Sequence, residues 1–447
     1  MIEKKISIAL FAFVITVGLA FTAGIMAFSD SSTGKANNDN QAKYAPDRVI
    51  VKIKGDKESF RVIAVPEGKV MEKVEKYQAE SDVVYAEPDY YIHSLNSNDT
   101  AYTNQWALNN TGQIIYKGSG NPNSPVDMTK PIGVGAIDAD VDWKEAWNGF
   151  STAAFSTAVI AVVDSGIDET HADLKEKIWL NADEIPGNKK DDDSNGFVDD
   201  TWGWDLVRKD NAPHDKYGHG THVSGIAAAE TNNGKGIAGV GFSNNIRIMP
   251  LQVLNDQGIG FTSDIAQGIK YAADNGAKVI NLSLGGSGSA TLKNAIDYAW
   301  NKGVVIVAAA GNNNGGAVIY PAAYENVLAV SATNYNDNIA SFSSIGTEID
   351  VAAPGENIFS TFPSYKFTIG TKYGRARYYD VGSGTSMAAP QVAGLAGLLF
   401  AQDNTRDRVA VRNIIEATAN DLGTSGKDNY FGYGRINIYA ALNYTTP

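Results

Sequence analysis

Cysteine is absent from the 447-residue chain. This absence excludes disulfide bonds, thiolate zinc sites, iron–sulfur clusters and cysteine nucleophiles. Basic residues are also scarce relative to acidic ones, because 37 Lys and Arg stand against 50 Asp and Glu, which gives a net charge of −13. A nucleic-acid-binding protein normally carries a basic surface, so we expect no nucleic-acid partner. The phosphate-binding pattern G-x-x-x-x-G-K-[ST] is missing as well, which argues against nucleotide binding.

The sequence has a single long apolar run, near the N-terminus. Lys4 and Lys5 precede it, and residues 6–28 carry no charge. A positive end followed by an apolar run is typical of a secretory signal peptide, and this run is also long enough to serve as an uncleaved membrane anchor. Both alternatives export the remainder of the chain. We therefore expect a secreted protein, with residues 1–29 as signal or anchor, 30–44 as a polar linker, and no other lasting contact with a membrane.

A small α+β unit is predicted next, over residues 45–95. Residues 49–54 and 83–91 have the pattern of strands, and residues 70–80 have helical spacing. A second polar stretch then separates this unit from the main domain, which we place at 96–447.

The main domain alternates apolar runs with helical patterns. Continuous apolar strands that alternate with helices predict an α/β fold with a doubly wound, mostly parallel sheet flanked by helices. In such sheets, functional sites form outside the carboxyl ends of the strands. The predicted strands are 158–164, 246–254, 277–284, 304–311, 327–333 and 349–355, and the clearest helices are 262–275 and 290–302.

Polar residues that could take part in catalysis or binding lie at the ends of these predicted elements. Asp164 ends an apolar run, His219 and His222 enter a small-residue helix, and Ser386 precedes a long apolar helix. Taken singly, Asp164 and Ser386 are consistent with helix N-caps, and the two histidines with a metal pair that lacks the acid of H-E-x-x-H. Taken together, they supply a nucleophile, a base and an acid that orients the base, in one of the known chain orders.

Three segments carry a resemblance to a known family. They read AVVDSGID (161–168), GHGTHVSGIAAA (218–229) and GTSMAAPQVAGLAGLL (384–399). They resemble, without a gap, the three active-site motifs of the subtilisin-like serine peptidases, peptidase family S8. The resemblance extends from about Gln105 to the C-terminal region and implies the subtilisin-like fold and serine endopeptidase activity.

The resemblance also implies a role for each catalytic position. Asp164 would orient the histidine, His219 would act as general base and acid, and Ser386 would be the nucleophile. Asn312 resembles the asparagine that donates to the oxyanion, although an asparagine in such a loop can also simply adopt a left-handed turn. His222 would be structural.

Two strand edges resemble the family's substrate-binding segments. Extended polypeptides bind such edges by main-chain hydrogen bonds, and glycine permits the close approach. Ile319 would stand near the floor of the pocket for the residue before the scissile bond and would shorten it. The implied substrate-binding residues are Ser283, Leu284 and Gly285 on one edge and Gly258, Ile259 and Gly260 on the other.

Calcium is the implied cofactor, at a site like that of the thermitase-like branch of the family. Two carboxylates with several neutral oxygens suit Ca²⁺. Asp99, Asp173 and the Asn233 side chain would bind the ion together with the backbone carbonyls of Glu230, Lys235 and Ile237.

A second calcium site is predicted from the residues of KDDDSNGFVDD (190–200). Its spacing matches the start of an EF-hand loop, but the closing Glu is missing, so that Asp200 or Asp199 would have to close it. A solvated acidic loop is the alternative. The predicted ligands are Asp191, Asp193, Asn195, the Phe197 carbonyl and Asp200.

The unit at 45–95 resembles the family's inhibitor-type propeptide, although it is short. The expected partners are therefore this propeptide and extended polypeptide substrates, and the expected state is a monomer. Two alternative functions fit the sequence less well. An inactive scaffold on the same fold is disfavoured because all four catalytic positions are filled. An α/β-hydrolase esterase would need G-x-S-x-G around its serine.

Overall fold

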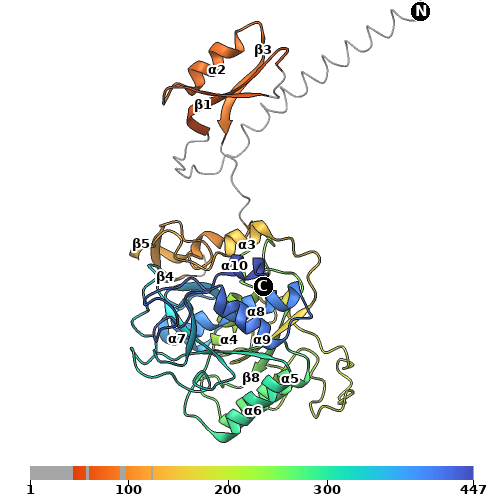
Figure 1. Ribbon diagram of the computed structural model, residues 1–447. Helices are drawn as coiled ribbons and strands as arrows, with labels where there is room; N and C mark the ends of the chain where they lie inside the picture. The colour runs from red at the N-terminus through yellow and green to blue at the C-terminus, as the bar shows by residue number, and fades with distance from the viewer. Residues whose placement is uncertain (1–43, 57–59, 91–96, 122–123, 446–447) are drawn as a thin grey trace, which may run out of the picture. The chain divides into compact units, whose positions relative to one another are not determined.

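The computed structural model describes residues 44–56, 60–90, 97–121 and 124–445 (Figure 1). The predicted signal or anchor and almost all of the predicted linker lie outside these residues, as does the junction 91–96. Contacts between Cα atoms divide the chain into two units, residues 1–94 and 95–447. Within the described ranges, no helix has the length and apolar character needed to cross a membrane.

The first unit contains a three-stranded antiparallel sheet and one helix. The strands lie in the order β2–β1–β3, and β2 was not predicted. Val70 and Val74 are four residues apart on the helix, and both are buried together with Val49 and Val51 of the sheet. The elements are β1 (Tyr44–Ile53), β2 (Arg61–Ala64), α2 (Val70–Gln78) and β3 (Val83–Tyr90).

The second unit is built on a seven-stranded sheet with the order β12–β11–β10–β9–β6–β8–β7. Every neighbouring pair is parallel, which confirms the predicted fold class. After β6 the chain adds β7 and β8 on one side and then β9 on the other, so the strand order reverses at β6. The strands are β6 (Ala158–Asp164), β7 (Trp204–Asp205), β8 (Ile246–Gln252), β9 (Val279–Leu282), β10 (Val305–Ala309), β11 (Leu328–Thr333) and β12 (Ile349–Pro354).

Helices cover both faces of this sheet, as the alternation along β6 requires. Ile160 and Val162 are buried in the core that contains α4 and α8, whereas Ala161 and Val163 are buried in the core that contains α5 and α6. Figure 1 shows α5 and α6 side by side below the sheet. The helices are α3 (Trp143–Gly149), α4 (His219–Ala228), α5 (Thr262–Asp274), α6 (Ala290–Asn301), α8 (Thr385–Gln402), α9 (Arg408–Ala417) and α10 (Ile438–Asn443).

Two antiparallel hairpins add to this framework and were not predicted. The first is β4 (Ile114–Asn121) with β5 (Ser124–Val134). The second is β13 (Ile358–Phe362) with β14 (Tyr378–Gly382), and their connection carries the short helix α7 (Thr368–Tyr373). The strands of the first hairpin are rich in Gly, Ser, Thr and Pro, so their apolar pattern is weak. The strands of the second are mostly apolar but only five residues long.

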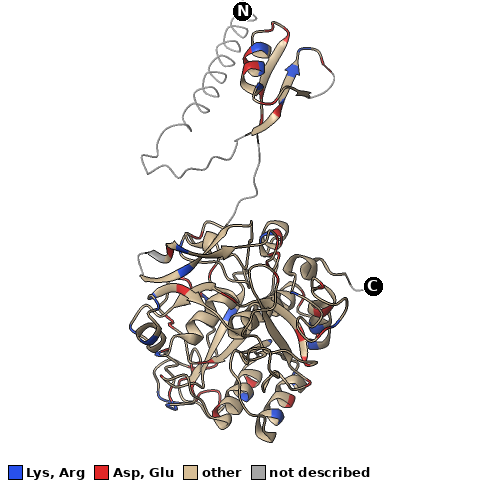
Figure 2. Cartoon of the chain, turned by 90° about the vertical axis from the view of Figure 1, so that its left-hand side faces the viewer, with Lys and Arg blue, Asp and Glu red and all other residues tan. Residues whose placement is uncertain are grey.

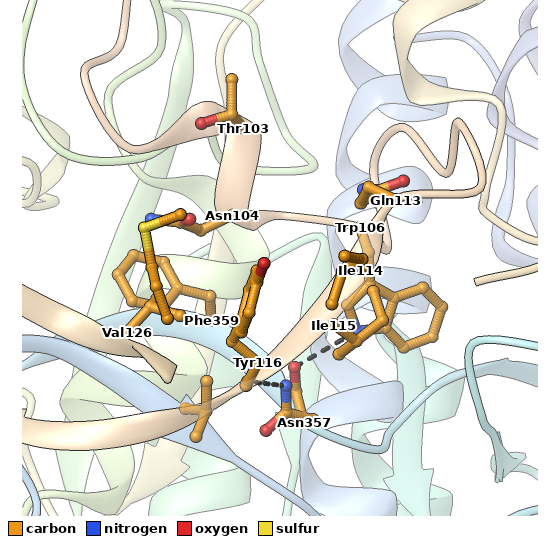
Figure 3. Close-up of a pocket in the computed structure, with 12 residues that line it drawn as sticks. Thr103, Asn104, Trp106, Gln113, Ile114, Ile115, Tyr116, Val126, Asn357 and Phe359 are labelled. Atoms are coloured by element: carbon orange, nitrogen blue, oxygen red, sulfur yellow. Dashed lines mark hydrogen bonds between the residues drawn. The ribbon is translucent and has the colours of Figure 1, made fainter. Parts of the chain in front are cut away.

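A hollow of about 450 Å³ lies beneath the first hairpin (Figure 3). Asn357 forms the floor of this hollow and is held by two hydrogen bonds. The Asn357 side-chain amide donates to the Tyr116 carbonyl at 2.9 Å, and the Asn357 backbone carbonyl accepts from the Trp106 indole at 3.2 Å. Phe359 and Ile115 line it with apolar surface. None of the predicted catalytic residues reaches this hollow.

Glycine allows α8 to approach α4 closely. A Cβ atom on Gly394 would lie 2.6 Å from the Ala227 carbonyl oxygen and 2.8 Å from Cβ of Val240. Both distances are below van der Waals contact, and the first involves backbone that cannot rotate away. The spacing of the two helices that carry His219 and Ser386 therefore depends on this glycine.

We predict that Gly394→Ala lowers the free energy of unfolding by about 1–3 kcal/mol, because overpacking outweighs the helix propensity that alanine adds. The measurement is denaturant unfolding in a Ser386→Ala background, which prevents self-digestion. Gly286→Ala is the matched control, because a Cβ there meets nothing within 4 Å. Equal stability of the two variants would contradict the close-packing argument.

Candidate active site

Asp164 lies at the carboxyl end of β6, where the strand order reverses. Its side chain is fully buried, and its two oxygens lie 2.8 and 2.9 Å from Nδ1 of His219. The Ser165 backbone N–H also donates to Oδ1 at 2.7 Å. A carboxylate buried in this way holds the imidazole in one orientation and favours a proton on Nδ1, so that Nε2 is free to accept one.

His219 is the first residue of α4, and a buried turn before it sets its position. Asp215 accepts hydrogen bonds from the backbone N–H groups of Gly218 at 2.6 Å and Thr221 at 2.8 Å. It also accepts from the Ser165 hydroxyl at 2.8 Å, which ties this turn to the residue after Asp164. Asp215 was not singled out from the sequence; its position four residues before His219 is the only local signal.

The pKa of His219 reflects two opposing effects. Burial alone would lower it, but the charge of Asp164 and the hydrogen bond to it outweigh burial and raise the pKa above its ordinary value of 6.5. His222, by contrast, is buried without such a partner, and burial with the neighbouring His219 lowers its pKa to about 3. His222 is therefore neutral at working pH, as a structural histidine would be.

Ser386 is the second residue of the buried helix α8 and shares a hollow of about 500 Å³ with His219 and Asn312. Its hydroxyl donates to the Ser283 carbonyl at 3.1 Å, and no hydrogen bond to His219 is formed among the described residues. Catalytic hydrogen bonds are often made only when substrate is present. The Ser386 backbone N–H is among the first N–H groups of the helix, which have no intrahelical acceptor.

Asn312 is held with its amide nitrogen available. Its Oδ1 accepts from the Thr385 backbone N–H at 2.9 Å and from the Thr385 hydroxyl at 3.1 Å. These two donors fix the oxygen, so that Nδ2 is the group that remains to donate into the hollow. The arrangement brings an amide N–H and a helix N-terminus to the same place, as stabilisation of an oxyanion requires.

The two predicted substrate edges face one another across a second hollow of about 360 Å³, which Tyr217 and His219 also line. Gly258 has φ +75°, and a Cβ there would lie 2.4 Å from the Tyr217 ring. Ile319 packs against the other edge, because a Cβ on Gly285 would meet its Cδ1 at 2.5 Å. The residues that line this hollow include Gly258, Ile259, Gly260, Ser283, Leu284 and Gly285.

The predicted first calcium ligands converge on the loop 230–237. Asp99 accepts from the backbone N–H of Asn233 at 3.0 Å, and Asp173 accepts from its amide at 3.0 Å and from the Ile237 N–H at 2.9 Å. Both carboxylates are buried, and burial together with the charge of Asp173 raises the pKa of Asp99 despite its N–H donors. Glu230 is tied to the same place by its N–H bond to the Asp173 carbonyl at 2.8 Å, and Lys235 by its N–H bond to Asn233 at 2.7 Å.

The predicted second calcium loop gathers a different set of carboxylates. Asp193 and Asp200 lie together with Glu184, each offering an oxygen within 4.8 Å of the others. Glu184 was missed from the sequence, since it precedes the loop. One of its oxygens accepts from the Asp193 backbone N–H at 3.3 Å, and the other is buried with no partner among the described residues.

The remaining predicted ligands of the second loop have other contacts. Asp191 is used within the loop, because its carboxylate accepts from the N–H groups of Asn195 at 3.0 Å and Gly196 at 2.8 Å. The Asn195 amide donates to both Asp193 and Asp200 at 3.0 Å. Phe197 packs its ring against Trp204 and Tyr271, and the Tyr271 hydroxyl donates to Asp200.

Comparison with known proteins identifies the family. Residues 156–434 match the model of the subtilase family. The chain is 41% identical over 411 residues to a thermophilic serine proteinase of Bacillus sp. (strain AK1), covering 92% of this chain and 83% of that protein. It is 42% identical over 324 residues to thermitase of Thermoactinomyces vulgaris, covering 72% of this chain and 99% of thermitase.

The chain belongs to the subtilase family. It is a subtilisin-like serine endopeptidase of the thermitase-like branch, as the motifs predicted. A solved protease structure from Pseudoalteromonas arctica PAMC 21717 is similar with a TM-score of 0.58 and 30% identity, over 78% of this chain and 99% of that one.

The subtilase should lose activity as the pH falls through the pKa of His219, because protonated imidazole cannot accept the serine proton. Since Asp164 raises that pKa, we predict an acid limb of kcat/KM with its midpoint above 6.5. Asp164→Asn should move the midpoint down and lower kcat by on the order of 10⁴-fold. A pH series of initial rates measures both, and Glu169→Gln, which alters only a nearby partner of His214, is the control. A midpoint that Asp164→Asn leaves in place would contradict the assignment.

Proposed function

We propose that this subtilase is a secreted, calcium-stabilised endopeptidase that cleaves polypeptides through an acyl-enzyme formed on Ser386. The observation that carries the proposal is the placement of His219 between the buried Asp164 carboxylate and the hollow it shares with Ser386 and Asn312. The nucleophile thus comes from α8, the base from α4, the orienting acid from β6 and the oxyanion donor from the loop after β10.

In the proposed reaction, the Ser386 hydroxyl turns from the Ser283 carbonyl to Nε2 of His219 and attacks the scissile carbonyl carbon. His219 takes the hydroxyl proton, and the oxyanion accepts hydrogen bonds from Nδ2 of Asn312 and the Ser386 backbone N–H. Collapse of the tetrahedral intermediate breaks the peptide bond, and His219 gives its proton to the leaving amine. Water then repeats the sequence on the acyl-enzyme and restores Ser386, while Asp164 holds the imidazole throughout.

The substrate is proposed to lie extended between the edges at 258–260 and 283–285. Glycine in both edges lets the substrate backbone approach closely, which suits recognition through main-chain groups. Ile319 narrows the space behind Gly285, so small apolar side chains should be preferred immediately before the scissile bond.

Calcium is proposed to neutralise the buried carboxylates of the first site. Asp99 and Asp173 are more than 90% buried, and neither forms an ion pair within the described residues. Two such carboxylates around one loop form a donor set of hard oxygens, which fits Ca²⁺. Asn233 would need to turn its amide oxygen inward, and the carbonyls of Glu230, Lys235 and Ile237 would complete the set. The bound ion would supply structural cross-linking, because none of these residues is catalytic.

The second site is proposed with Glu184 added to the ligands expected from the sequence. Its buried oxygen without a partner lies beside Asp193 and Asp200, which is where a cation would be most stabilising. Asp191, Asn195 and the Phe197 carbonyl remain candidate ligands, and Asp191 also accepts backbone N–H groups within the loop. Asp200, and not Asp199, closes the set, because Asp199 accepts the N–H groups of Asn188 and Lys189 at 3.1 and 2.8 Å.

Export and maturation complete the proposal. Residues 1–29 would direct secretion or anchor the chain, 30–44 would be a linker, 45–95 would act as a propeptide, and 96–447 would form the mature enzyme. The mature enzyme is proposed to be a monomer.

We predict that Ser386→Ala folds but hydrolyses peptides at least about 10⁴-fold more slowly, because the nucleophile is lost while the start of α8 tolerates alanine. It should also accumulate as a precursor that retains residues 45–95, because self-cleavage needs the same hydroxyl. Intact mass, N-terminal sequencing and a peptide assay measure this, and Ser425→Ala at an exposed loop is the control. Normal turnover by Ser386→Ala would refute the mechanism, and an inactive wild-type chain would favour the scaffold alternative.

We predict that chelation lowers the melting temperature more than it lowers initial rates. A ligand bound only by the folded state stabilises it by about 2.7 kcal/mol at a hundredfold excess over Kd. Enzyme inactivated with a serine-directed reagent is freed of metal and titrated with Ca²⁺ in a melting assay. Asp173→Asn should remove one stabilising transition and Asp193→Asn another, with Asp297→Asn on the surface as control. A melting temperature that Ca²⁺ leaves unchanged would refute both sites.

A further inference from the structure

The connection between β13 and β14 is unusually basic for this chain. Residues 363–377 contain Lys366, Lys372, Arg375 and Arg377 and no Asp or Glu, in a chain of net charge −13. Figure 2 shows Asp and Glu as well as Lys and Arg on the second unit, and the loop 183–200 is mainly acidic. A local excess of positive charge attracts ligands or substrate segments of negative charge.

This connection is fastened beside the catalytic histidine. The backbone N–H of Thr368 donates to the Lys216 carbonyl at 3.0 Å, and that of Ile369 donates to the Tyr217 carbonyl at 3.1 Å. Lys216 and Tyr217 immediately precede the turn into His219. Phe367 is buried and stacks on Phe362 with ring centroids 5.1 Å apart. The start of α7 is therefore held at the rim of the active site by backbone and core contacts.

The connection lies on the side of the site opposite the two substrate edges. Those edges line the hollow that would hold the residues before the scissile bond. The other hollow contains Ser386 together with Ile369, Tyr373 and Arg375 of the connection. Both hollows meet at Tyr217 and His219. The residues after the scissile bond, which leave with the amine, would thus pass over α7.

Three lysines gather at an adjacent part of the same connection. Lys216, Lys366 and Lys372 line one hollow of about 370 Å³ together with residues of α7. All three are exposed, and none forms an ion pair with a described carboxylate. The acidic residues close to the connection already have partners. Asp168 is buried and accepts the Ser364 N–H at 2.8 Å, and the buried Asp380 faces Arg375 at 3.8 Å. Glu169 is partly exposed and pairs with His214 at 2.9 Å.

We propose that α7 and these three lysines form a basic rim that selects substrates with acidic residues two to four positions after the scissile bond. The first residue after the bond would lie against Ile369 and Tyr373, and the next ones would reach the lysine hollow. This inference rests on the proposed endopeptidase function and adds a charge preference on the leaving side. Exposed charges act through water, so each lysine contributes modestly and the preference depends on ionic strength.

The first experiment compares internally quenched peptides with one common sequence before the scissile bond. The second to fourth residues after the bond are all Glu, all Ala or all Lys. The rim should make kcat/KM for the Glu peptide roughly three- to tenfold higher than for the Ala peptide, and the Lys peptide lower. The difference should collapse at 1 M NaCl, where the Debye length is about 3 Å. Equal rates for the three peptides at low salt would overturn the proposal.

The second experiment reverses the rim with Lys366→Glu combined with Lys372→Glu. The readout is the ratio of kcat/KM for each peptide to that for an anilide with the same acyl part, which ends at the scissile bond and cannot reach the rim. The ratio for the Glu peptide should fall and that for the Lys peptide should rise. Lys278→Glu is the control, because Lys278 precedes β9 at the opposite end of the sheet.

The outcomes separate the two proposals. If neither anilide nor peptide is cleaved by the wild-type enzyme, the proposed function is wrong. If the anilide is cleaved but the peptides show no charge preference, only the rim is wrong. A preference that Lys278→Glu alters as much as the double variant would assign it to overall charge and would also overturn the rim. If the double variant does not fold, the wild-type peptide series decides alone.

Discussion

The hydrogen bonds between Asp164 and His219 join β6, the strand at which the strand order reverses, to α4, and the geometry of the site depends on them. A fully buried carboxylate is costly unless it is paired and hydrogen-bonded. Here the Ser165 N–H and the imidazole supply the partners, while Asp215 holds the turn that delivers the imidazole. The pairing with His219 thus lowers the free-energy cost of burying the Asp164 carboxylate and also sets the orientation of the base.

Close helix packing carries this geometry to the nucleophile. α4 and α8 lie on the same face of the sheet, and Gly394 lets α8 approach the backbone of α4. Because Ser386 is at the start of α8 and His219 at the start of α4, the spacing of the two helices sets the spacing of the two side chains. The catalytic arrangement is therefore a property of the core as much as of the site.

Much of the fold and the members of the candidate catalytic set could be predicted from the sequence because both leave local signals. Buried parallel strands appear as continuous apolar runs, and the strand predicted at 158–164 has those bounds in β6. Other strands end earlier than their apolar runs, as β8 does at Gln252, because the following residues turn away while staying buried. The first hairpin was missed because its Gly-, Ser- and Pro-containing strands have a weak apolar pattern, and the second because its strands are only five residues long. Both hairpins form separate sheets outside the central one. Glu184 and Asp215 were missed because their roles arise from contacts that one sequence does not reveal.

The position of α7 also depends on contacts that one sequence does not reveal. It shows why substrate specificity is harder to predict from a sequence than catalytic chemistry. The basic composition of 363–377 is visible in the sequence, but its location depends on two backbone hydrogen bonds to Lys216 and Tyr217. On the proposed substrate path, the two sides of the site would work by different physics. On one side, glycine-bearing edges would offer backbone groups, and the space beside Ile319 would select by size, so that salt has little effect. On the other, lysine side chains would distinguish substrates by charge across water, where salt screens them. Such an enzyme would select by shape before the scissile bond and by charge after it, with ionic strength acting on only one of the two.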